Sequence, residues 1–174
     1  VLYNPSFLSL IKDQRWKKIE DSQLNKYETA NEPIRYRTFA RELFRMIIIG
    51  LGTNLKVQNF SSLRETCGAA MVEMEHRGLK INRYSSWYQS PPWPPSDQPW
   101  YVNGVCAITT ELNPIELLEQ LFVIEQKFGR KRSVKNAPRT LDLDILAYNG
   151  VVTDAESDPI LPHPRLFERA FVLY

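Results

Sequence analysis

Two aspartates stand two residues apart in an otherwise apolar stretch, "APRTLDLDIL", which runs from position 137 to position 146. In a β-strand, side chains two residues apart point to the same face, so Asp142 and Asp144 would emerge side by side. Two carboxylates this close resist joint ionisation unless a cation lies between them. Mg²⁺ prefers one or two carboxylates together with water and phosphate oxygens. The pair therefore indicates a magnesium site, although the exposed polar face of an edge strand would give the same spacing.

A run of basic residues precedes this strand and contains no acidic residue. The segment "GRKRSVKNAPR" carries Arg130, Lys131, Arg132, Lys135 and Arg139. Guanidinium groups bind phosphate oxygens in pairs and lysine supplies a point charge, so the run suits a polyphosphate. Taken alone, it would favour a solvated surface or a nucleic-acid contact. Beside the two aspartates, phosphoryl chemistry on a nucleotide explains both features together.

Aromatic residues gather around a proline-rich segment and suit a flat ligand. The segment "PPWPPSDQP" (91–99) predicts a stiff, irregular loop. An asparagine side chain offers both a donor and an acceptor to the edge of a heterocycle, and aromatic rings supply stacking. The candidates are Tyr88, Trp93, Trp100, Tyr101 and Asn103. Trp100 and Tyr101 are adjacent on a predicted strand, so only one of them can face a site, and any single ring could equally belong to the core.

Two further segments contain candidate ligand-binding groups. The segment "LPHPRLFERAF" adds His163, Arg165, Arg169 and Phe171 where the chain is expected to return to the sheet, although a lone histidine is more often structural. The segment "GLGTNL" (50–55) lacks the third glycine of a dinucleotide fingerprint and the Gly-Lys-Ser/Thr of a P-loop. We interpret it as a tight turn between a strand and a helix, in which Asn54 could bond a ligand or cap the helix.

Composition bounds the class of protein. A chain of 174 residues that is 43% hydrophobic can bury a sizeable core, and a net charge of +2 selects no partner. No apolar run approaches the roughly 20 residues that span a bilayer, and the first residues show no signal peptide, so we expect a cytoplasmic protein. Cys67 and Cys106 lack metal-ligand spacing, and we expect two free, buried thiols.

Periodicity predicts elements in the order β-α-β-β-α-β. A strand in "MIIIGLGTNL" is followed by a helix within 55–77 that stops at Gly78, and strands are expected at 79–90 and from position 100. The segment "NPIELLEQLFVIEQKFG" is the clearest helix, with Asn113 as its cap, Pro114 in the first position and Gly129 at its end. The fourth strand is "RTLDLDILAYNG", and its last two residues predict a hairpin turn.

This order predicts an α+β fold of the ferredoxin-like type, an antiparallel βαββαβ sheet with both helices packed on one face. We expect Val151 and Val152 to resume pairing after the turn, and a short helix and closing strand to follow Pro164. The fold therefore includes an extra C-terminal hairpin or strand. Composition changes near position 46, so we expect an N-terminal appendage of unknown role (1–45) and one domain (46–174).

Four segments, taken in order, resemble the 6-hydroxymethyl-7,8-dihydropterin pyrophosphokinases of folate biosynthesis. They are "GLGTNL", "SPPWPPSDQPWYVN", "EQKFGRKRSVKNAPRTLDLDIL" and "LPHPRLFERAFVL", and the resemblance runs from Met46 to Tyr174. It implies transfer of the β,γ-pyrophosphoryl group of ATP to the pterin hydroxymethyl oxygen, with release of AMP. It also implies two Mg²⁺ ions that bridge the ATP phosphates. We expect ATP and the pterin as ligands, no nucleic acid, no membrane, and a monomer.

The resemblance also implies roles for individual residues. Asp142 and Asp144 would hold the metal ions and form the catalytic set with Arg130 and Arg132. The ATP side would comprise Glu125, Arg139, Ile145, His163 and Arg169. The pterin side would comprise Gly52, Ser90, Pro91, Pro92, Tyr101, Asn103 and Phe171. No protein base is needed, because in-line positioning and electrostatics carry this class of reaction.

Two alternatives remain open. The chain stops at "FVLY", where the family usually continues, and Asn136 stands where some members have a tryptophan, so one alternative is a truncated, non-catalytic domain. The other is a ferredoxin-like nucleic-acid-binding module, with arginines on phosphates and rings stacked on bases. That module leaves Asp142 and Asp144 unexplained, because acids on the binding face would repel a phosphate backbone.

Overall fold

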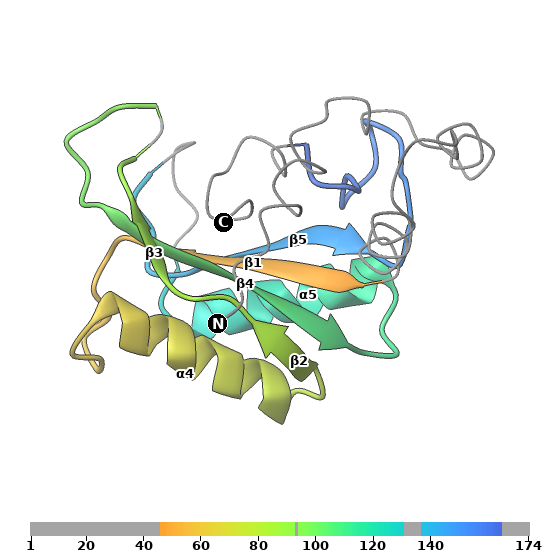
Figure 1. Ribbon diagram of the computed structural model, residues 1–174, viewed down its shortest axis with the longest axis horizontal. Coiled ribbons are helices and arrows are strands. Elements are labelled where there is room, and N and C mark those ends of the chain that lie inside the picture. Colours follow the sequence, from red (N-terminus) through yellow and green to blue (C-terminus); the bar gives the residue numbers. More distant parts are fainter. Residues whose placement is uncertain (1–45, 93, 131–136, 165–174) are drawn as a thin grey trace, which may run out of the picture.

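A five-stranded antiparallel sheet is the framework of the computed structural model, which describes residues 46–92, 94–130 and 137–164. Strand β1 (Ile47–Thr53) pairs on one side with β4 (Tyr101–Thr109) and on the other with β5 (Asp142–Tyr148). Strand β4 also pairs with β2 (Lys80–Tyr84) and β3 (Tyr88–Ser90). Helices α4 (Leu63–His76) and α5 (Pro114–Lys127) lie together below the sheet in Figure 1. The α+β class and the antiparallel sheet expected from the sequence are confirmed.

The two faces of the sheet carry different residues because strand side chains alternate. On β1, Ile47, Ile49 and Leu51 are almost fully buried against the helices, and the alternate residues Ile48, Gly50 and Gly52 face the other way. On β5, Leu143 and Ile145 join the same core. The face opposite the helices therefore includes Gly50 and Gly52 on β1 and the two aspartates on β5.

Both helices begin at capping residues. Asn113 caps α5 with its side-chain oxygen on the N–H groups of Ile115 and Glu116, and the Glu116 carboxylate accepts the N–H of Asn113 at 2.9 Å. This capping box satisfies N–H groups that a helix start leaves without partners. The helix ends before Gly129, whose φ of 78° is a left-handed conformation that favours glycine. The predicted start and stop of this helix are confirmed.

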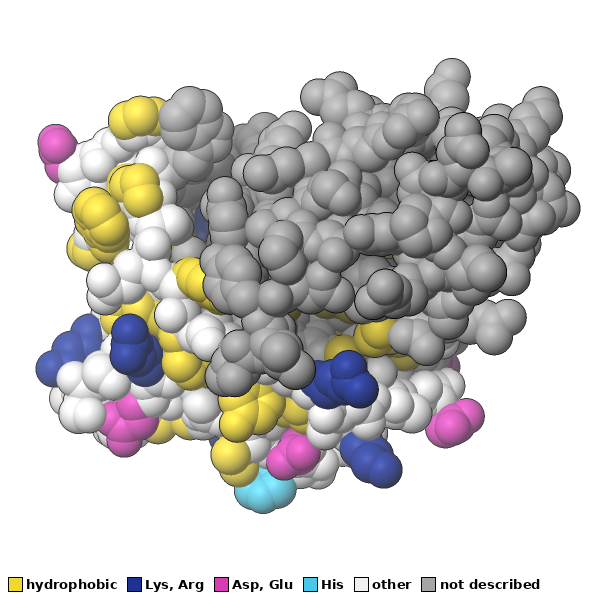
Figure 2. Space-filling model, viewed as in Figure 1, with side chains coloured by type: hydrophobic (Ala, Val, Ile, Leu, Met, Phe, Trp, Pro, Cys, Tyr) yellow, Lys and Arg dark blue, Asp and Glu magenta, His cyan; other side chains and the backbone are white. Residues whose placement is uncertain are grey.

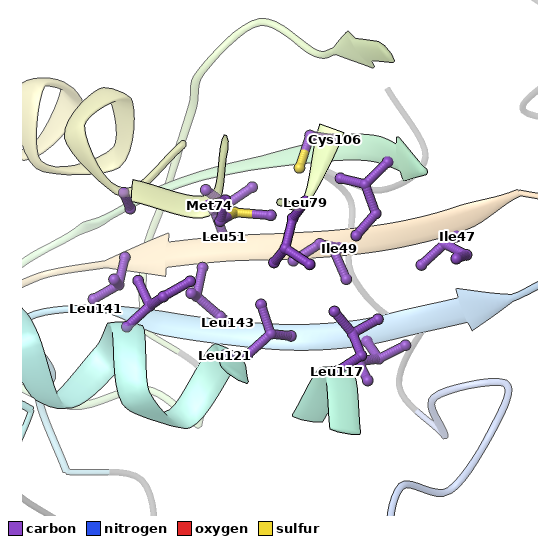
Figure 3. Packing of buried hydrophobic residues seen from close by; sticks show 14 of the residues in the cluster. Ile47, Ile49, Leu51, Met74, Leu79, Cys106, Leu117, Leu121, Leu141 and Leu143 are labelled. Carbon is purple, nitrogen blue, oxygen red and sulfur yellow. The ribbon is translucent and has the colours of Figure 1, made fainter. Parts of the chain in front are cut away.

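One apolar core fills the space between the helices and the sheet. Figure 3 shows Leu117 and Leu121 reaching from α5 toward the strands, with Met74 entering from α4. The predicted apolar face of α5, which is Leu117, Leu121, Ile124 and Phe128, is buried throughout.

Ion pairs join the two helices beside this core. Glu73 of α4 accepts hydrogen bonds from Arg77 at 2.8 Å and from Lys127 of α5 at 2.6 Å. Acidic and basic side chains are also mixed along the lower edge of the face shown in Figure 2, where Figure 1 places α4. The described surface here has no single sign of charge, so it favours no partner on electrostatic grounds.

The first helix lies within its predicted limits. It was expected within 55–77, and α4 begins at Leu63, where Ser62 caps the helix and accepts the N–H of Glu65 at 3.2 Å. The Glu65 carboxylate in turn accepts the N–H of Ser61 at 2.7 Å. Asn54 is therefore not the helix cap. Gly78 stands just after the helix with a φ of 82°, as predicted.

Two strand predictions also need correction. The expected strand at 79–90 is interrupted between β2 and β3, where the N–H of Ser85 bonds the Val105 carbonyl. Asn149 and Gly150 form the predicted turn, but Val151 and Val152 are not in a strand. After the turn the chain leaves the sheet and closes on itself, where the Thr153 N–H meets the Leu161 carbonyl at 2.8 Å. The helix and strand expected after Pro164 lie outside the described residues.

Neither α4 nor α5 has the length and apolar character of a membrane crossing, and the described part of the chain contains no other candidate span.

A substitution at Gly104 tests the packing of Trp87 against β4. A Cβ at Gly104 would lie 2.7 Å from two ring carbons of Trp87, so we expect Gly104→Ala to destabilise the fold by about 1–3 kcal/mol. Gly68 in α4 has open space around its Cβ position, so Gly68→Ala should stabilise by about 0.5–1 kcal/mol. Urea unfolding measures both, and equal stabilities of the two variants would contradict this packing.

The two cysteines should be unreactive in the native protein. Cys67 and Cys106 are free and buried, and burial raises the pKa of each thiol to about 12. Because the thiolate is the reacting form, we expect a disulfide reagent at pH 8 to modify neither thiol before unfolding and both after addition of urea. Fast modification of either thiol in the folded chain would contradict this burial.

Candidate active site

Gly52 lies at the centre of a row of residues that crosses the sheet. It pairs with Asn103 on β4 and with Asp142 on β5, and Asn103 pairs in turn with Tyr88 on β3. A Cβ at Gly52 would lie 3.1 Å from Asn103 Oδ1 and 3.9 Å from Asp142 Cβ. The amide and the carboxylate are therefore neighbours, separated by a residue without a side chain. The sheet thus brings Asn103, which the family resemblance implies for the pterin, close to Asp142, which it implies for the metal.

The two predicted metal ligands share this face of β5. Asp142 lies opposite Gly52, and Asp144 lies opposite Gly50, so β1 places no side chain beside either carboxylate. Asp142 is 8% exposed and Asp144 is half-buried. Their neighbours Leu141 and Leu143 are buried in the core on the other face, as the alternation predicted.

Two arginines hold the carboxylate of Asp142 from opposite ends of the basic segment. Arg130 Nη1 is 2.6 Å from Asp142 Oδ1, and Arg139 Nη1 is 2.7 Å from Asp142 Oδ2. Burial is the largest single effect and acts to lower the pKa of Arg139, but the charges of Asp142, Tyr101 and Asp144 and the hydrogen bond to Asp142 together raise that pKa overall. A buried carboxylate needs such charged partners, because an unpaired charge away from water is costly. Arg130 and Arg139 are thus within reach of any group bound at Asp142.

Glu125 of α5 lies beneath this cluster and is 2% exposed. Its Oε1 accepts the N–H of Leu143 at 2.7 Å and is also bonded by Arg130. Burial raises the pKa of this carboxyl to about 7, against the hydrogen bond from Leu143 and the charge of Arg130, which lower it. In this structure Glu125 therefore anchors Arg130 and the edge of β5.

The residues assigned to the pterin lie on the other side of Gly52. Asn103 is 5% exposed, and its Nδ2 donates to Ser90 Oγ at 2.9 Å. Tyr101 pairs with Ser90 and stands two residues from Asn103 on β4, so the two side chains share a face. Trp100 is 60% exposed just before the strand. Pro91 and Pro92 continue from β3 directly after Ser90.

The remaining predicted residues fall farther from the row or outside it. Ile145 packs in the core on the helix side, so only its backbone could meet a ligand on the opposite face. His163 is half-buried. Its backbone N–H donates to the carbonyl of Leu146 at 3.0 Å, which places the segment around His163 beside β5. Arg132, Arg169 and Phe171 lie outside the described residues, as do Trp93, Lys131, Lys135 and Arg165.

Sequence reasoning missed Gln98, which connects the proline-rich loop to the rest of the site. Its Oε1 accepts hydrogen bonds from Asn54 Nδ2 at 3.3 Å and from the Tyr101 hydroxyl at 3.4 Å. Gln98 and Asn54 are 44 positions apart, so no local spacing signals the contact. The proline-rich segment 91–99, which contains Gln98, predicted only a stiff, irregular loop.

The carboxylates fit a magnesium site of the type expected. The described residues contain no group of three or more His, Cys, Asp or Glu side chains that could hold a metal ion. Mg²⁺ with a bound polyphosphate needs only one or two carboxylates, because phosphate and water supply the other oxygens. Asp142 and Asp144 present such a pair on one face, and Gly52 places no side chain between Asp142 and Asn103.

Comparison with known proteins agrees with this geometry. Residues 48–174 match the family model described as 7,8-dihydro-6-hydroxymethylpterin-pyrophosphokinase (HPPK). The 2-amino-4-hydroxy-6-hydroxymethyldihydropteridine pyrophosphokinase of Bacillus subtilis is 40% identical over 125 residues, which cover 72% of this chain and 72% of that protein. The enzyme of the same name from Methylorubrum extorquens is 38% identical over 125 residues, which cover 72% of this chain and 76% of that protein.

A fungal relative is much longer than this chain. The folic acid synthesis protein fol1 of Pneumocystis carinii is 41% identical over 104 residues, which cover 60% of this chain but only 14% of that protein. The chain thus corresponds to a small part of that relative and to most of the two bacterial ones. Because the family model matches most of its residues, the chain belongs to the 7,8-dihydro-6-hydroxymethylpterin-pyrophosphokinase family.

Proposed function

We propose that this chain transfers the β,γ-pyrophosphoryl group of ATP to 6-hydroxymethyl-7,8-dihydropterin and releases AMP. The observation that carries the proposal is the row formed by Asn103, Gly52 and Asp142. It sets an amide that can recognise a heterocycle directly beside carboxylates that can hold a metal-bound polyphosphate. The membership of the chain in the family supports the same activity.

In this reaction the hydroxymethyl oxygen forms a bond to the β-phosphorus of ATP while the bond from that phosphorus to the α-phosphate oxygen breaks. AMP takes the bonding electrons, and the hydroxyl proton leaves to solvent. Positioning and charge stabilisation carry most of the acceleration in phosphoryl transfer. The chain must therefore align the two substrates and neutralise the phosphate charge.

The described residues divide this work. Asp142 and Asp144 would hold two Mg²⁺ ions, which supply charge neutralisation and orientation of the phosphates when bound. Arg130 and Arg139 now donate hydrogen bonds to Asp142. With a nucleotide bound they would donate to its phosphate oxygens, whose geometry suits the paired donors of a guanidinium group. Asn103 would bond the pterin edge. No described group is required as a base.

Further assignments extend the proposal to residues taken from the family resemblance. Arg132 and Arg169 would add charge at the triphosphate, with His163 beside them. Glu125 would act on the nucleotide side through Arg130, and Ile145 through its backbone. Tyr101, Ser90 and the neighbouring Pro91 and Pro92 would line the pterin pocket, with Phe171 stacking on the ring.

The finer description of the fold belongs to the same proposal. We infer a ferredoxin-like domain over 46–174, because the strand order β2-β4-β1-β5 with both helices on one face is the order that this topology requires. The closing strand expected after Pro164 stays a prediction. The expected monomer in the cytoplasm, without a nucleic-acid or membrane partner, remains a prediction, and so does the separate role of residues 1–45.

The test of the activity is release of AMP. The chain is incubated with ATP and Mg²⁺, with and without 6-hydroxymethyl-7,8-dihydropterin. AMP that requires both the metal and the pterin would support pyrophosphoryl transfer. A folded chain that binds ATP but releases no AMP would instead indicate a non-catalytic domain, and RNA binding without Mg²⁺ would favour a nucleic-acid module.

Removal of either metal-binding carboxylate should stop turnover without unfolding the chain. We expect Asp142→Asn and Asp144→Asn to lower kcat by roughly two orders of magnitude or more, because metal ions supply several kcal/mol of transition-state stabilisation. Asp154→Asn, at an exposed carboxylate after β5, is the matched control and should keep wild-type activity. Near-normal AMP release by either site variant would exclude the metal assignment.

Truncation of Asn103 should affect the pterin and spare the nucleotide. We expect Asn103→Ala to weaken pterin binding about tenfold, the value of one or two hydrogen bonds, with ATP affinity within about twofold of wild type. Asn82, which bonds Thr109 at the other end of the sheet, gives the control variant Asn82→Ala. Titration of each ligand separates the two effects. Equal losses for ATP and pterin would contradict a distinct pterin pocket.

A further inference from the structure

Thr140 lies between Arg139 and Asp142, and the assignments above give its hydroxyl no role. The Oγ1 atom of Thr140 is buried, yet it has no hydrogen-bond partner. Within the described ranges, no other buried side-chain nitrogen or oxygen atom of this kind lacks one. A hydroxyl that loses water and gains no partner destabilises a fold, so native proteins rarely keep one.

The main chain is fixed on both sides of Thr140. The N–H of Arg139 donates to Asn54 Oδ1 at 2.8 Å, and the carbonyl of Arg139 accepts the N–H of Asn54 at 3.1 Å. Asp142, on the other side of Thr140, is paired with Gly52 in the sheet. The backbone therefore holds the hydroxyl in place, and a loosely packed loop does not explain its missing partner.

The side chain of Thr140 lies on the side of the chain that carries the metal-binding carboxylates. Leu141 is fully buried in the core between the sheet and the helices. Consecutive side chains of an extended segment point to opposite sides, so Thr140 lies on the same side as Asp142. Arg139 reaches that carboxylate as well, with its Nη1 at 2.7 Å from Asp142 Oδ2. The hydroxyl is therefore directed toward the site.

The chemistry of this position favours an anionic ligand. Arg130 and Arg139 already donate to the two oxygens of Asp142. Phosphate oxygens only accept hydrogen bonds, and the hydroxyl of Thr140 has one hydrogen to donate. A hydrogen bond to a charged oxygen is also stronger than one between neutral groups. A phosphate group bound by the two arginines would lie close to the residue between Arg139 and Asp142.

We propose that Thr140 is a nucleotide-binding residue whose hydroxyl donates a hydrogen bond to a phosphate oxygen of bound ATP. The inference rests on the proposed function and adds one residue to its ATP side. In the complex the hydroxyl gains the partner that it lacks in the free chain. A threonine with a purely structural role would instead have its hydroxyl bonded before any ligand binds.

The experiment removes the hydroxyl of Thr140 from the full chain and measures stability and binding separately. Thr140→Val replaces the hydroxyl with a methyl group of similar size. We expect the midpoint of urea unfolding without ligand to rise, because the unpaired buried hydroxyl is gone. The ligand is Mg²⁺ with an ATP analogue that has a methylene group between its α- and β-phosphates. Its dissociation constant should rise about tenfold, the value of one hydrogen bond to a charged group, and that of the pterin should stay within about twofold of wild type.

Two further variants separate the hydroxyl from packing. Thr140→Ser keeps the hydroxyl and should bind the ATP analogue within about twofold of wild type. Thr66→Val is the matched control, because Thr66 is a fully buried threonine on α4 whose hydroxyl donates to the carbonyl of Ser62 at 3.3 Å. This control should not raise the unfolding midpoint and should leave the affinity for the analogue unchanged.

Unchanged affinity for the analogue in Thr140→Val would overturn the inference while the wild type still binds the analogue and releases AMP. A lower unfolding midpoint in that variant would also overturn it, because the hydroxyl then has a partner in the free chain. Weak binding that Thr140→Ser does not restore would assign the loss to packing, against the inference. If Thr140→Val does not fold, Thr140→Ala carries the same binding test without an added methyl group. A wild-type chain that binds no analogue would overturn the proposed function itself, and this inference with it.

Discussion

The site depends on the compensation of one buried negative charge. Asp142 is almost completely removed from solvent, and two guanidinium groups lie within 2.7 Å of its two oxygens. Those groups belong to the first and last arginines of the basic segment, so one carboxylate fixes both ends of that segment. A site for a charged ligand is thus organised before the ligand arrives.

Glu125 adds a second acidic group to the same cluster and carries a cost. Its charge is shielded by Arg130 and by the N–H of Leu143, yet burial still raises the pKa of the carboxyl to about 7. Glu125 and Asp142 both bond Arg130, Asp142 also bonds Arg139, and the negative charge of Asp144 acts on Glu125 as well. Positive charge from a bound metal would relieve the excess of carboxylates, which is a physical reason for this cluster to bind cations together with phosphates.

Local sequence signals were sufficient for much of this arrangement. The alternation of β1 and β5 predicted that Asp142 and Asp144 oppose a buried face, and the Asn113 and Gly129 signals bounded α5. The range 55–77 contained α4 but did not specify its start, which Ser62 determines by accepting the N–H of Glu65. Pairing of Val151 and Val152 was wrong because the chain closes through Thr153 and Leu161 instead. Contacts such as Asn54 with Gln98 join distant segments, and no periodicity records them.

The division of β1 between two faces has a consequence for how the protein can change. Residues at odd positions from Ile47 to Leu51 build the core, and Gly50 and Gly52 at even positions belong to the site. Substitutions on the site face can therefore alter ligand preference while leaving the packing beneath unchanged. Insertion or loss of one residue is different, because it exchanges the two faces and sends both sets to the wrong side. This strand should accept changes of residue type far more readily than changes of length.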